Sequence, residues 1–217
     1  MTKCFVFAME EEAKATIEDF DFVEVIKKPF NFYKNENDYL LITTIGIMNA
    51  AAAVMWANEN YNIDEYYNLG LVGSIGKKIK VLDIVVIDKV YTANADATGF
   101  GYKLGQIPGM PEYHESNKLK FKHDYEIVDL CSSNMFINSV GLFQKNMEII
   151  SKNIKVFDME LSGVYSTLYK LNKVKYSIKI VSDVLSLGNN ELQFDEILKE
   201  GSKKISEVVK KIVSVSH

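Results

Sequence analysis

The segment Cys4-Phe5-Val6-Phe7-Ala8-Met9-Glu10-Glu11-Glu12 places an apolar run of strand length directly before an acidic cluster. Short apolar runs are typical of buried strands, and carboxylates favour the positive end of a helix dipole. The segment therefore predicts a buried strand over Cys4–Ala8 that leads at once into a helix. In open α/β sheets, junctions of this kind lie at the sheet edge where ligands bind.

The same alternation continues along the 217-residue chain, where strand-length apolar runs are separated by longer segments of helical period. The predicted strands cover Phe22–Ile26, Phe30–Tyr33, Tyr39–Thr44, Tyr66–Val72, Ile84–Tyr91, Ile127–Ser132 and Tyr176–Val181, with Lys155–Asp158 as an edge segment. The predicted helices cover Asn49–Asn60, Val140–Lys152, Leu161–Leu171 and the region from Phe194 to Ile212. This pattern predicts an α/β fold, a three-layer αβα sandwich with a central mixed sheet, in a single domain over residues 1–217.

The connections refine this picture. Pro29 and the Asn35–Asp38 cluster separate three short strands, which favours a meander over crossovers. Gly73 and Gly76 indicate a tight turn after the strand over Tyr66–Val72, and Gly70, near the end of that strand, is grouped with them as a turn glycine. The irregular stretch from Ala93 to Tyr113 contains four glycines and two prolines. Loops of that length in compact domains are usually functional or bind a partner.

The last helix is predicted by a clear apolar stripe. Its apolar residues recur at intervals of three and four, with lysines and glutamates on the opposite face. They are Phe194, Ile197, Leu198, Ile205, Val208, Val209 and Ile212. We expect this stripe to pack on the sheet.

Composition excludes several classes of partner. The formal charge is -4 and no basic cluster exceeds a lysine pair, which argues against nucleic acid and favours a small molecule. No apolar stretch is long enough to span a bilayer and the N-terminus has no signal-peptide layout, so we expect no membrane association and a cytoplasmic location. Cys4 and Cys131 are expected to be two buried, reduced thiols. Lysines account for the whole Lys+Arg count of 25, so the chain contains no arginine.

Four places combine polar residues with the end of a strand, where a site could lie. They are Glu10–Glu12, Phe136-Ile137-Asn138, Asp158-Met159-Glu160 and Ser182-Asp183. Taken singly, each has a simpler explanation as a helix start, a helix cap or core packing. His114, His123 and His217 have no metal-ligand spacing, and the chain has no P-loop or GxGxxG motif. We expect no metal and no cofactor.

Taken together and in order, these places resemble the bacterial methylthioadenosine/S-adenosylhomocysteine nucleosidases over nearly the whole chain. The matching motifs are Phe7-Ala8-Met9-Glu10-Glu11-Glu12, Asn68-Leu69-Gly70 with Gly73, Val81-Leu82-Asp83-Ile84-Val85-Val86, Asp96 to Tyr102 with Gly105 to Gly109, Phe136-Ile137-Asn138, Met159-Glu160, Ser182-Asp183 and Phe194-Asp195-Glu196. The resemblance implies a nucleoside phosphorylase/hydrolase-like fold, a homodimer, and hydrolysis of the N-glycosidic bond of adenine nucleosides in methionine salvage.

Breaking the bond between ribose C1′ and purine N9 develops positive charge on the sugar and negative charge on the base. The resemblance assigns three acids to this task. Asp183 would protonate adenine N7, for which it needs a poorly solvated position. Glu12 would deprotonate the attacking water, and Glu160 would hydrogen-bond the ribose hydroxyls and support the cationic sugar.

The resemblance also implies a set of residues that bind the substrate. Met159 would pack beneath the ribose, Phe136 would stack on adenine while the Ile137 backbone reads its edge, and Phe194 would cover the base. Phe100 and Pro108 would reach from the 93–113 loop into the site of a neighbouring subunit. The further substrate-binding positions implied are Ala8, Ile45, Gly73, Ala97, Lys179 and Ser182.

Three positions depart from the family pattern, and two other functions stay open. Leu71 stands where the family usually has serine, Lys179 where it has arginine near the attacking water, and Asn134 where aspartate is common. A purine nucleoside phosphorylase is one alternative, although phosphate sites normally use arginines and this chain has none. A nucleoside-binding paralogue with reduced catalysis is the other.

Overall fold

The computed structural model of the protein describes residues 1–76, 78–135, 141–185 and 194–215, except for the side chains of residues 142–144. Within these residues, ten strands form one sheet. In spatial order they are β2 (Val23–Ile26), β3 (Phe32–Lys34), β4 (Tyr39–Ile42), β1 (Lys3–Phe7), β5 (Glu65–Ser74), β9 (Ile154–Asp158), β8 (Glu126–Ser132), β6 (Ile84–Thr92) and β10 (Val174–Val184), while β7 (His114–Glu115) pairs with β6.

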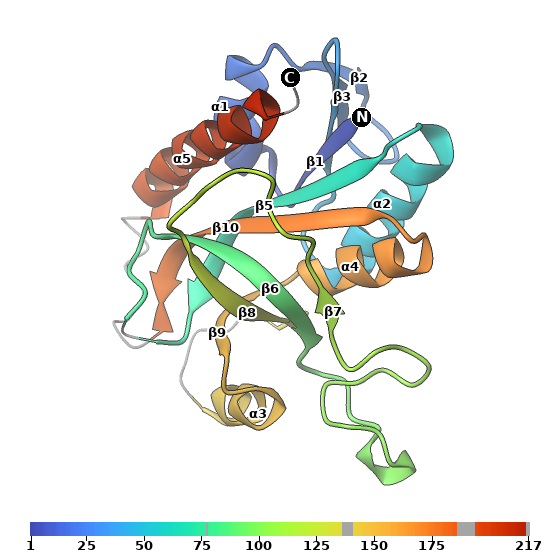
Figure 1. Ribbon diagram of the computed structural model, residues 1–217, viewed down its shortest axis with the longest axis vertical. Coiled ribbons are helices and arrows are strands. Elements are labelled where there is room, and N and C mark those ends of the chain that lie inside the picture. Colours follow the sequence, from blue (N-terminus) through green and yellow to red (C-terminus); the bar gives the residue numbers. More distant parts are fainter. Residues whose placement is uncertain (77, 136–140, 186–193, 216–217) are drawn as a thin grey trace.

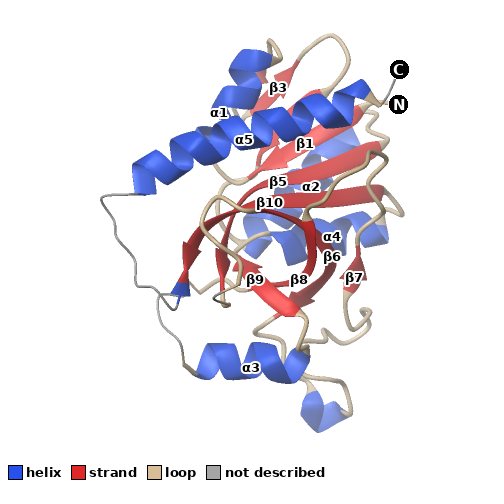
Figure 2. Cartoon of the chain, turned by 60° about the vertical axis from the view of Figure 1, so that its left-hand side comes forward, coloured by secondary structure: helices blue, strands red, loops and turns tan. Residues whose placement is uncertain are grey.

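The sheet closes on itself at one end. Because β10 pairs with β5 as well as with β6, the strands β5, β9, β8, β6 and β10 form a ring. Figure 2 shows β6, β8 and β9 curling away from the flatter part of the sheet. β4, β1, β5 and β10 are parallel, and β2, β3 and β4 form an antiparallel meander. The predicted mixed sheet and meander are therefore confirmed.

Helices cover both faces of the sheet, as the predicted three-layer sandwich requires (Figures 1 and 2). α1 (Glu10–Asp19) and α5 (Phe194–Ser214) lie together on one face. α2 (Ile47–Asn60) and α4 (Leu161–Lys170) lie together on the other. α3 (Leu142–Ile150) lies apart from both pairs, and the 3-10 turn η1 (Thr98–Phe100) is the one helical turn of the long 93–113 loop.

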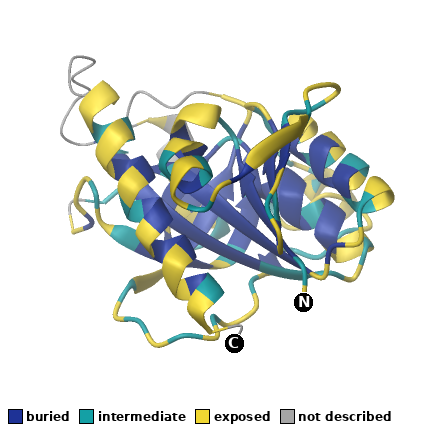
Figure 3. Ribbon diagram, turned by 90° about the horizontal axis from the view of Figure 1, so that it is seen from above, coloured by how far each residue is buried: buried dark blue, intermediate teal, exposed yellow. Residues whose placement is uncertain are grey.

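Burial follows these layers. Alternate residues of each central strand contribute to two apolar clusters, one beneath α2 and α4 and one beneath α1 and α5. On α5, the predicted stripe is buried at Ile205, Val208, Val209 and Ile212, while the opposite side of the helix is exposed (Figure 3). Cys4 and Cys131 are both buried and free, as expected.

Three features differ from the sequence-based expectations. The segment Lys155–Asp158 does not lie at an edge, because β9 pairs with β8 on one side and β5 on the other. Gly70 and Gly73 lie inside β5 rather than in a turn, and Ser182 and Asp183 lie within β10 rather than after it. These strands run further than their apolar cores because hydrogen bonds to neighbouring strands, not apolar side chains, sustain their last residues.

Among the described residues, we find no helix with the length and apolar character needed to span a membrane.

Candidate active site

The carboxyl ends of five strands meet at one edge of the sheet. β4, β1, β5 and β10 are parallel, so the segments that follow them leave the sheet on the same side. β9 arrives there from the opposite direction, because its Phe157 pairs with Gly73 near the end of β5. The acidic residues that the sequence singled out at or near the ends of β1, β9 and β10 therefore share this edge.

Glu12 is a buried carboxylate held by the backbone. It lies in the first turn of α1, where its Oε2 accepts a hydrogen bond of 3.2 Å from the N–H of Met9. Its Oε1 accepts a second bond of 2.8 Å from the N–H of Leu71 on β5. Burial raises the pKa of Glu12, whereas these two N–H groups and the charge of Lys179 oppose the rise. Glu12 is thus held between α1 and β5 in a buried position, where its carboxylate can accept a proton.

Gly70 leaves room for this carboxylate. Its φ is +143°, a region that side chains rarely adopt, and a Cβ there would lie 3.0 Å from Oε1 of Glu12. Sequence reasoning took Gly70 for a turn residue. The signal that could have identified it is a glycine inside a strand pattern, which often marks a close approach to the backbone.

Asp158 and Glu160 have different roles: Asp158 caps a helix, whereas Glu160 belongs to the site. Asp158 accepts hydrogen bonds from Ser132 Oγ at 2.6 Å and from the N–H of Leu161 at 3.2 Å, and so caps α4. Glu160 turns towards α2, where its Oε1 accepts a bond of 3.1 Å from the N–H of Gly46. The capping interpretation of this segment therefore holds for Asp158 and not for Glu160.

Glu160 has a strongly perturbed proton affinity. Its pKa is raised to about 7, first by burial and then by the negative charge of Asp158. The charge of Lys179 and the N–H of Gly46 act in the opposite direction, and Glu12 contributes a smaller rise. Glu12, Glu160, Asp158 and Lys179 thus form one electrostatically connected cluster at the end of the sheet.

Lys179 supplies the cluster's positive charge. Its side chain is 3% exposed, and its Nζ lies 3.3 Å from Oδ2 of Asp158. The lysine within an otherwise apolar strand was the sequence signal for this position. Its partner Asp158 belonged to one of the four candidate segments, but sequence reasoning assigned it no role beyond helix capping.

Asp183 lies near the end of β10, opposite Gly73 of β5, where the register shifts between Val181 and Asp183. Its Oδ1 accepts a hydrogen bond of 2.7 Å from Ser182 Oγ, and the Asp183 residue is partly exposed. The structure thus places Asp183 at the same sheet edge as the two glutamates. It is less enclosed than Glu12 and Glu160 within the described residues.

Gly73 makes room for a protein side chain. A Cβ on Gly73 would lie 2.2 Å from the ring of Phe157. Phe157 is buried and packs in a third apolar cluster beside β8 and β9. The side-chain space at Gly73, predicted to contact substrate, is therefore filled by Phe157, which sequence reasoning did not identify.

The other predicted binding residues fall into four groups. Ala8, Ile45 and Met159 lie in junctions between a strand and a helix at the site edge, partly or largely exposed. Phe194 begins α5 and is 44% exposed. Ala97, Phe100 and Pro108 belong to the 93–113 loop, where Phe100 is 87% exposed. Phe136 and Ile137 lie outside the described residues.

Two of the departures from the family pattern have structural roles. The Leu71 side chain packs beneath α5, where a Cβ on Gly201 would lie 2.9 Å from its Cδ2, and only its N–H serves Glu12. The Asn134 Oδ1 accepts a hydrogen bond of 2.9 Å from the N–H of Ile47 at the start of α2. Asn134 is therefore a helix cap next to the junction that binds Glu160.

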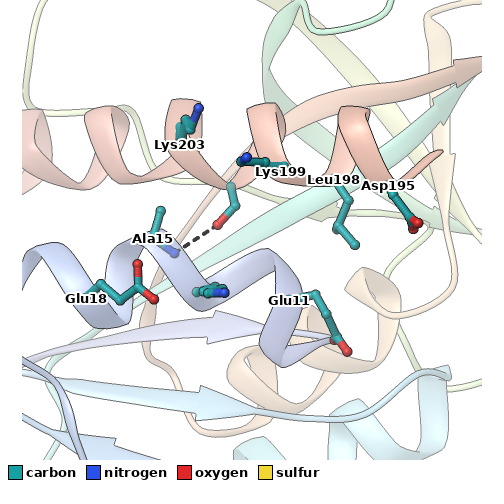
Figure 4. A pocket seen from close by; sticks show the side chains of 9 residues that line it. Glu11, Ala15, Glu18, Asp195, Leu198, Lys199 and Lys203 are labelled. Carbon is teal, nitrogen blue, oxygen red and sulfur yellow. Dashed lines mark hydrogen bonds between the residues drawn. The ribbon is translucent and has the colours of Figure 1, made fainter. Parts of the chain in front are cut away.

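A surface groove of about 500 Å³ is lined by residues of α1 and α5, and none of the three site acids lines it (Figure 4). It runs between α1 and α5, where Ser202 Oγ accepts a hydrogen bond of 3.0 Å from the N–H of Ala15. Glu11, Lys14, Glu18 and Lys203 line it with charges of both signs. Glu12 is turned the other way, so the groove does not contain the cluster.

Comparison with known proteins decides the family. The family model described as the phosphorylase superfamily matches residues 2–214. The chain belongs to the phosphorylase superfamily. Within this superfamily, it is 30% identical to the 5′-methylthioadenosine/S-adenosylhomocysteine nucleosidase of Staphylococcus aureus over 180 residues, which cover 78% of each protein. The resemblance drawn from the sequence motifs is thereby confirmed.

Solved structures of the superfamily share the fold. The nucleosidase of Neisseria meningitidis in complex with methylthio-immucillin-A superposes with a TM-score of 0.85, at 25% identity and with 98% of each chain covered. The nucleosidase of Streptococcus pneumoniae in complex with 8-aminoadenine gives a TM-score of 0.84 at 22% identity, with 98% of this chain and 99% of that chain covered. The predicted nucleoside phosphorylase-like architecture is confirmed.

Proposed function

We propose that this protein hydrolyses the N-glycosidic bond of adenine nucleosides, with 5′-methylthioadenosine and S-adenosylhomocysteine as substrates and adenine and a 5-thioribose product released. One observation carries the proposal. A chain of this family holds two buried glutamates, Glu12 and Glu160, against one buried lysine at the carboxyl edge of its sheet. This is the charge arrangement that activation of water beside a cationic sugar requires.

The roles of the three acids follow from their surroundings. Glu12 acts only as an acceptor in its hydrogen bonds, so it can receive a proton from water; burial raises its pKa, and the N–H of Leu71 and the charge of Lys179 oppose this rise. Glu160 is bound to the N–H of Gly46 at the same edge of the sheet, where its carboxylate can bind ribose hydroxyls and stabilise positive charge on the sugar. Asp183 is at the same edge and would protonate N7 of the departing adenine, with the bound base itself excluding water from the carboxyl group.

The remaining contacts are proposed on the family pattern. Met159 follows β9 directly before Glu160 and would pack beneath the ribose. Ala8, Ile45 and Ser182 would line the site edge. Phe136, Ile137 and Phe194 would enclose the base.

We favour water over phosphate as the acceptor. Enzymes that bind phosphate normally use arginines, and this chain has none. The buried lysine at the site, Lys179, is already paired with Asp158. Purified protein should therefore release adenine from methylthioadenosine at the same rate with and without phosphate, and the sugar product should be free 5-methylthioribose. Strict phosphate dependence with a sugar 1-phosphate product would identify a phosphorylase, and binding measured by calorimetry without turnover would identify a nucleoside-binding protein.

We also propose a homodimer in which the 93–113 loop of one subunit completes the site of the other. The loop exposes Phe100 and Ile107, and the start of α2 exposes Met48 beside the site. Apolar side chains exposed in this way are typical of interfaces. Phe100, Pro108 and Ala97 would then surround the 5′-thio substituent of the neighbour's substrate.

We propose further that this nucleosidase acts in the cytoplasm, in methionine salvage. Both thiols are buried and free, and burial raises their pKa values, which suits a reduced state. Fractionation of cells that express a tagged chain tests this location.

A further inference from the structure

The start of α2 is capped by side chains from distant parts of the chain. Its N-cap residue is Gly46, which has no side chain to bind the free N–H groups of the first turn. Instead, the N–H of Gly46 donates a hydrogen bond of 3.1 Å to Oε1 of Glu160, and the N–H of Ile47 donates one of 2.9 Å to Oδ1 of Asn134. Two consecutive N–H groups thus bind the carboxylate proposed for the ribose and a neutral amide.

The turn between β4 and α2 has an unusual backbone. Thr44 has a φ of +62° and Gly46 a φ of +112°. A β-branched residue such as threonine rarely adopts a positive φ, and a conformation of this kind persists only where its surroundings hold it. On one side, the N–H of Thr43 donates a hydrogen bond of 2.8 Å to the backbone oxygen of Phe7 on β1. On the other side, the turn is held by Asn134.

Asn134 can hold the turn because its own backbone is anchored. It lies two residues after β8, and Ser133 between them is fully buried. The N–H of Ser133 donates a hydrogen bond of 3.0 Å to the backbone oxygen of Asp158, and its Oγ accepts one of 3.0 Å from Nδ2 of Asn94. The Asn134 residue is exposed, so water can replace its side chain at little cost in stability.

The contact with α4 decides how α2 would move without this cap. A Cβ on Gly163 of α4 would lie 2.1 Å from the backbone oxygen of Ile47, so α2 cannot come closer to α4. Glu160 directly precedes α4. A shift of α2 away from α4 therefore withdraws the N–H of Gly46 from Glu160.

We propose that Asn134 is a positioning residue for ribose recognition. By capping α2, it holds the N–H of Gly46 against Glu160 and so fixes the carboxylate that binds the ribose hydroxyls. This inference rests on the proposed nucleosidase function, from which Glu160 takes its role. An exposed amide thus sets, through Glu160, how strongly the protein prefers a sugar with hydroxyls to one without them.

Asn134→Ala tests this role through the sugar alone. The ratio of kcat/KM for methylthioadenosine to that for its 2′,3′-dideoxy analogue should fall about tenfold, because a hydrogen bond to a charged group contributes roughly that factor. Inhibition by free adenine, which has no sugar, should be unchanged. An unchanged ratio would overturn the proposal, and so would an equal loss of adenine binding.

Two further variants are the controls. Asn134→Asp keeps an acceptor oxygen for the N–H of Ile47, so it should restore the ratio. Asn60→Ala removes another asparagine of the same region, whose Nδ2 donates a hydrogen bond of 2.7 Å to the backbone oxygen of Trp56 at the far end of α2. Asn60→Ala should leave the ratio at its wild-type value. A fall as large as in Asn134→Ala would show that any loosening of α2 is enough, and the specific role would be wrong.

A double variant tests whether Asn134 acts through Glu160. Glu160→Gln should itself lower the preference for the sugar with hydroxyls. Adding Asn134→Ala to Glu160→Gln should then change the ratio little further, because residues that act through one contact are not additive. Fully additive losses would contradict the proposal.

Amide hydrogen exchange gives a readout that does not need activity. The N–H of Gly46 should exchange faster in Asn134→Ala than in wild type and at an unchanged rate in Asn60→Ala. Faster exchange in a protein that releases no adenine would keep the link between Asn134 and Glu160 and remove the nucleosidase. An active wild type whose Asn134→Ala variant keeps both the exchange rate and the preference for ribose would do the reverse.

Discussion

Glu12 shows at the residue scale how a carboxylate can be buried and still serve as a base. Both oxygens accept hydrogen bonds from backbone N–H groups, and no side chain has to move to hold them. The geometry depends on a neighbour without a side chain, because Gly70 lies against the carboxylate. The site thus depends on the absence of a Cβ at Gly70 as well as on Glu12 itself.

Gly70→Ala should damage catalysis more than folding. The new Cβ would lie 3.0 Å from Oε1 of Glu12 at a φ of +143°, so the carboxylate must shift. A displacement of this kind can lower the rate by about a hundredfold. Adenine release and the thermal midpoint should be measured together with those of Gly76→Ala, where a Cβ has open space. Equal rates in both variants would contradict the role of Gly70.

Glu12→Gln and Asp183→Asn should each abolish adenine release while the fold survives. Both substitutions preserve shape and one carbonyl acceptor but remove the proton transfer, a loss of about 10²–10⁴ in rate. Steady-state assays with circular dichroism as the folding control test this. Rates like those of wild type in either variant would remove the assignment of roles.

Glu160 should make stability depend on pH. Its pKa rises from an ordinary 4.5 to about 7 on folding, so the folded chain binds more protons than the unfolded chain between these values. The unfolding free energy therefore falls as the pH rises through this window. The glutamine of Glu160→Gln does not titrate. The unfolding free energy of the variant, compared with that of wild type at the same pH, should therefore rise by on the order of 3 kcal/mol from about pH 4.5 to pH 8. Urea titrations at both pH values measure it, and a constant difference would argue against the raised pKa.

At the scale of elements, the crossing of α2 and α4 places Glu160. α2 begins next to Gly46, whose N–H binds Glu160, and α4 begins directly after Glu160. The two helices approach closely at Gly163, where a Cβ would lie 2.1 Å from the backbone oxygen of Ile47. The missing side chain of Gly163 therefore lets α2 and α4 approach closely enough for the N–H of Gly46 to bind Glu160.

Gly163→Ala should destabilise the protein although alanine favours helices. The clash is with backbone, so α2 and α4 must separate, at a cost of about 1–3 kcal/mol. Gly201→Ala in α5 is the matched control, because its Cβ would meet only the end of the Leu71 side chain, which can rotate. Thermal unfolding should show a lower midpoint for the first variant and little change for the second. Equal midpoints would show that the helices adjust freely.

At the scale of the whole molecule, the sheet brings the acids of the site together, whereas the 93–113 loop extends away from the sheet. Figure 1 shows the loop extending to the far end of the molecule from α1 and α5. Phe100 at its tip is 87% exposed. The exposure of this aromatic side chain is explained if a second copy of the chain covers it in a dimer.

Mixing two defective variants tests this arrangement. Glu12→Gln has a damaged site and an intact loop, whereas Phe100→Asp has an intact site and a damaged loop. Subunit exchange should create mixed dimers with one complete site, and so restore about a quarter of the wild-type activity. Size-exclusion chromatography of each variant is the control. A mixture no more active than its components would contradict the shared site.

Periodicity and local chemistry were enough to predict much of the molecule. The stripe of α5, the strand before Glu12, the meander and the mixed sheet depend on neighbours in sequence, so they can be recognised without coordinates. The motif order likewise indicated the family. β9 was misplaced because a strand of five residues carries no record of which strands it pairs with.

The sequence by itself determined the layers, the family and the acids that stand at strand ends. Only the tertiary structure decided that Asp158 anchors Lys179, that Gly70 makes room for Glu12 and that Phe157 fills the space at Gly73. The physical reason is that helices and strands arise from short-range repeats, whereas these contacts join residues more than 20 positions apart. Such contacts exist only after the sheet has closed and excluded water from the charges between its strands.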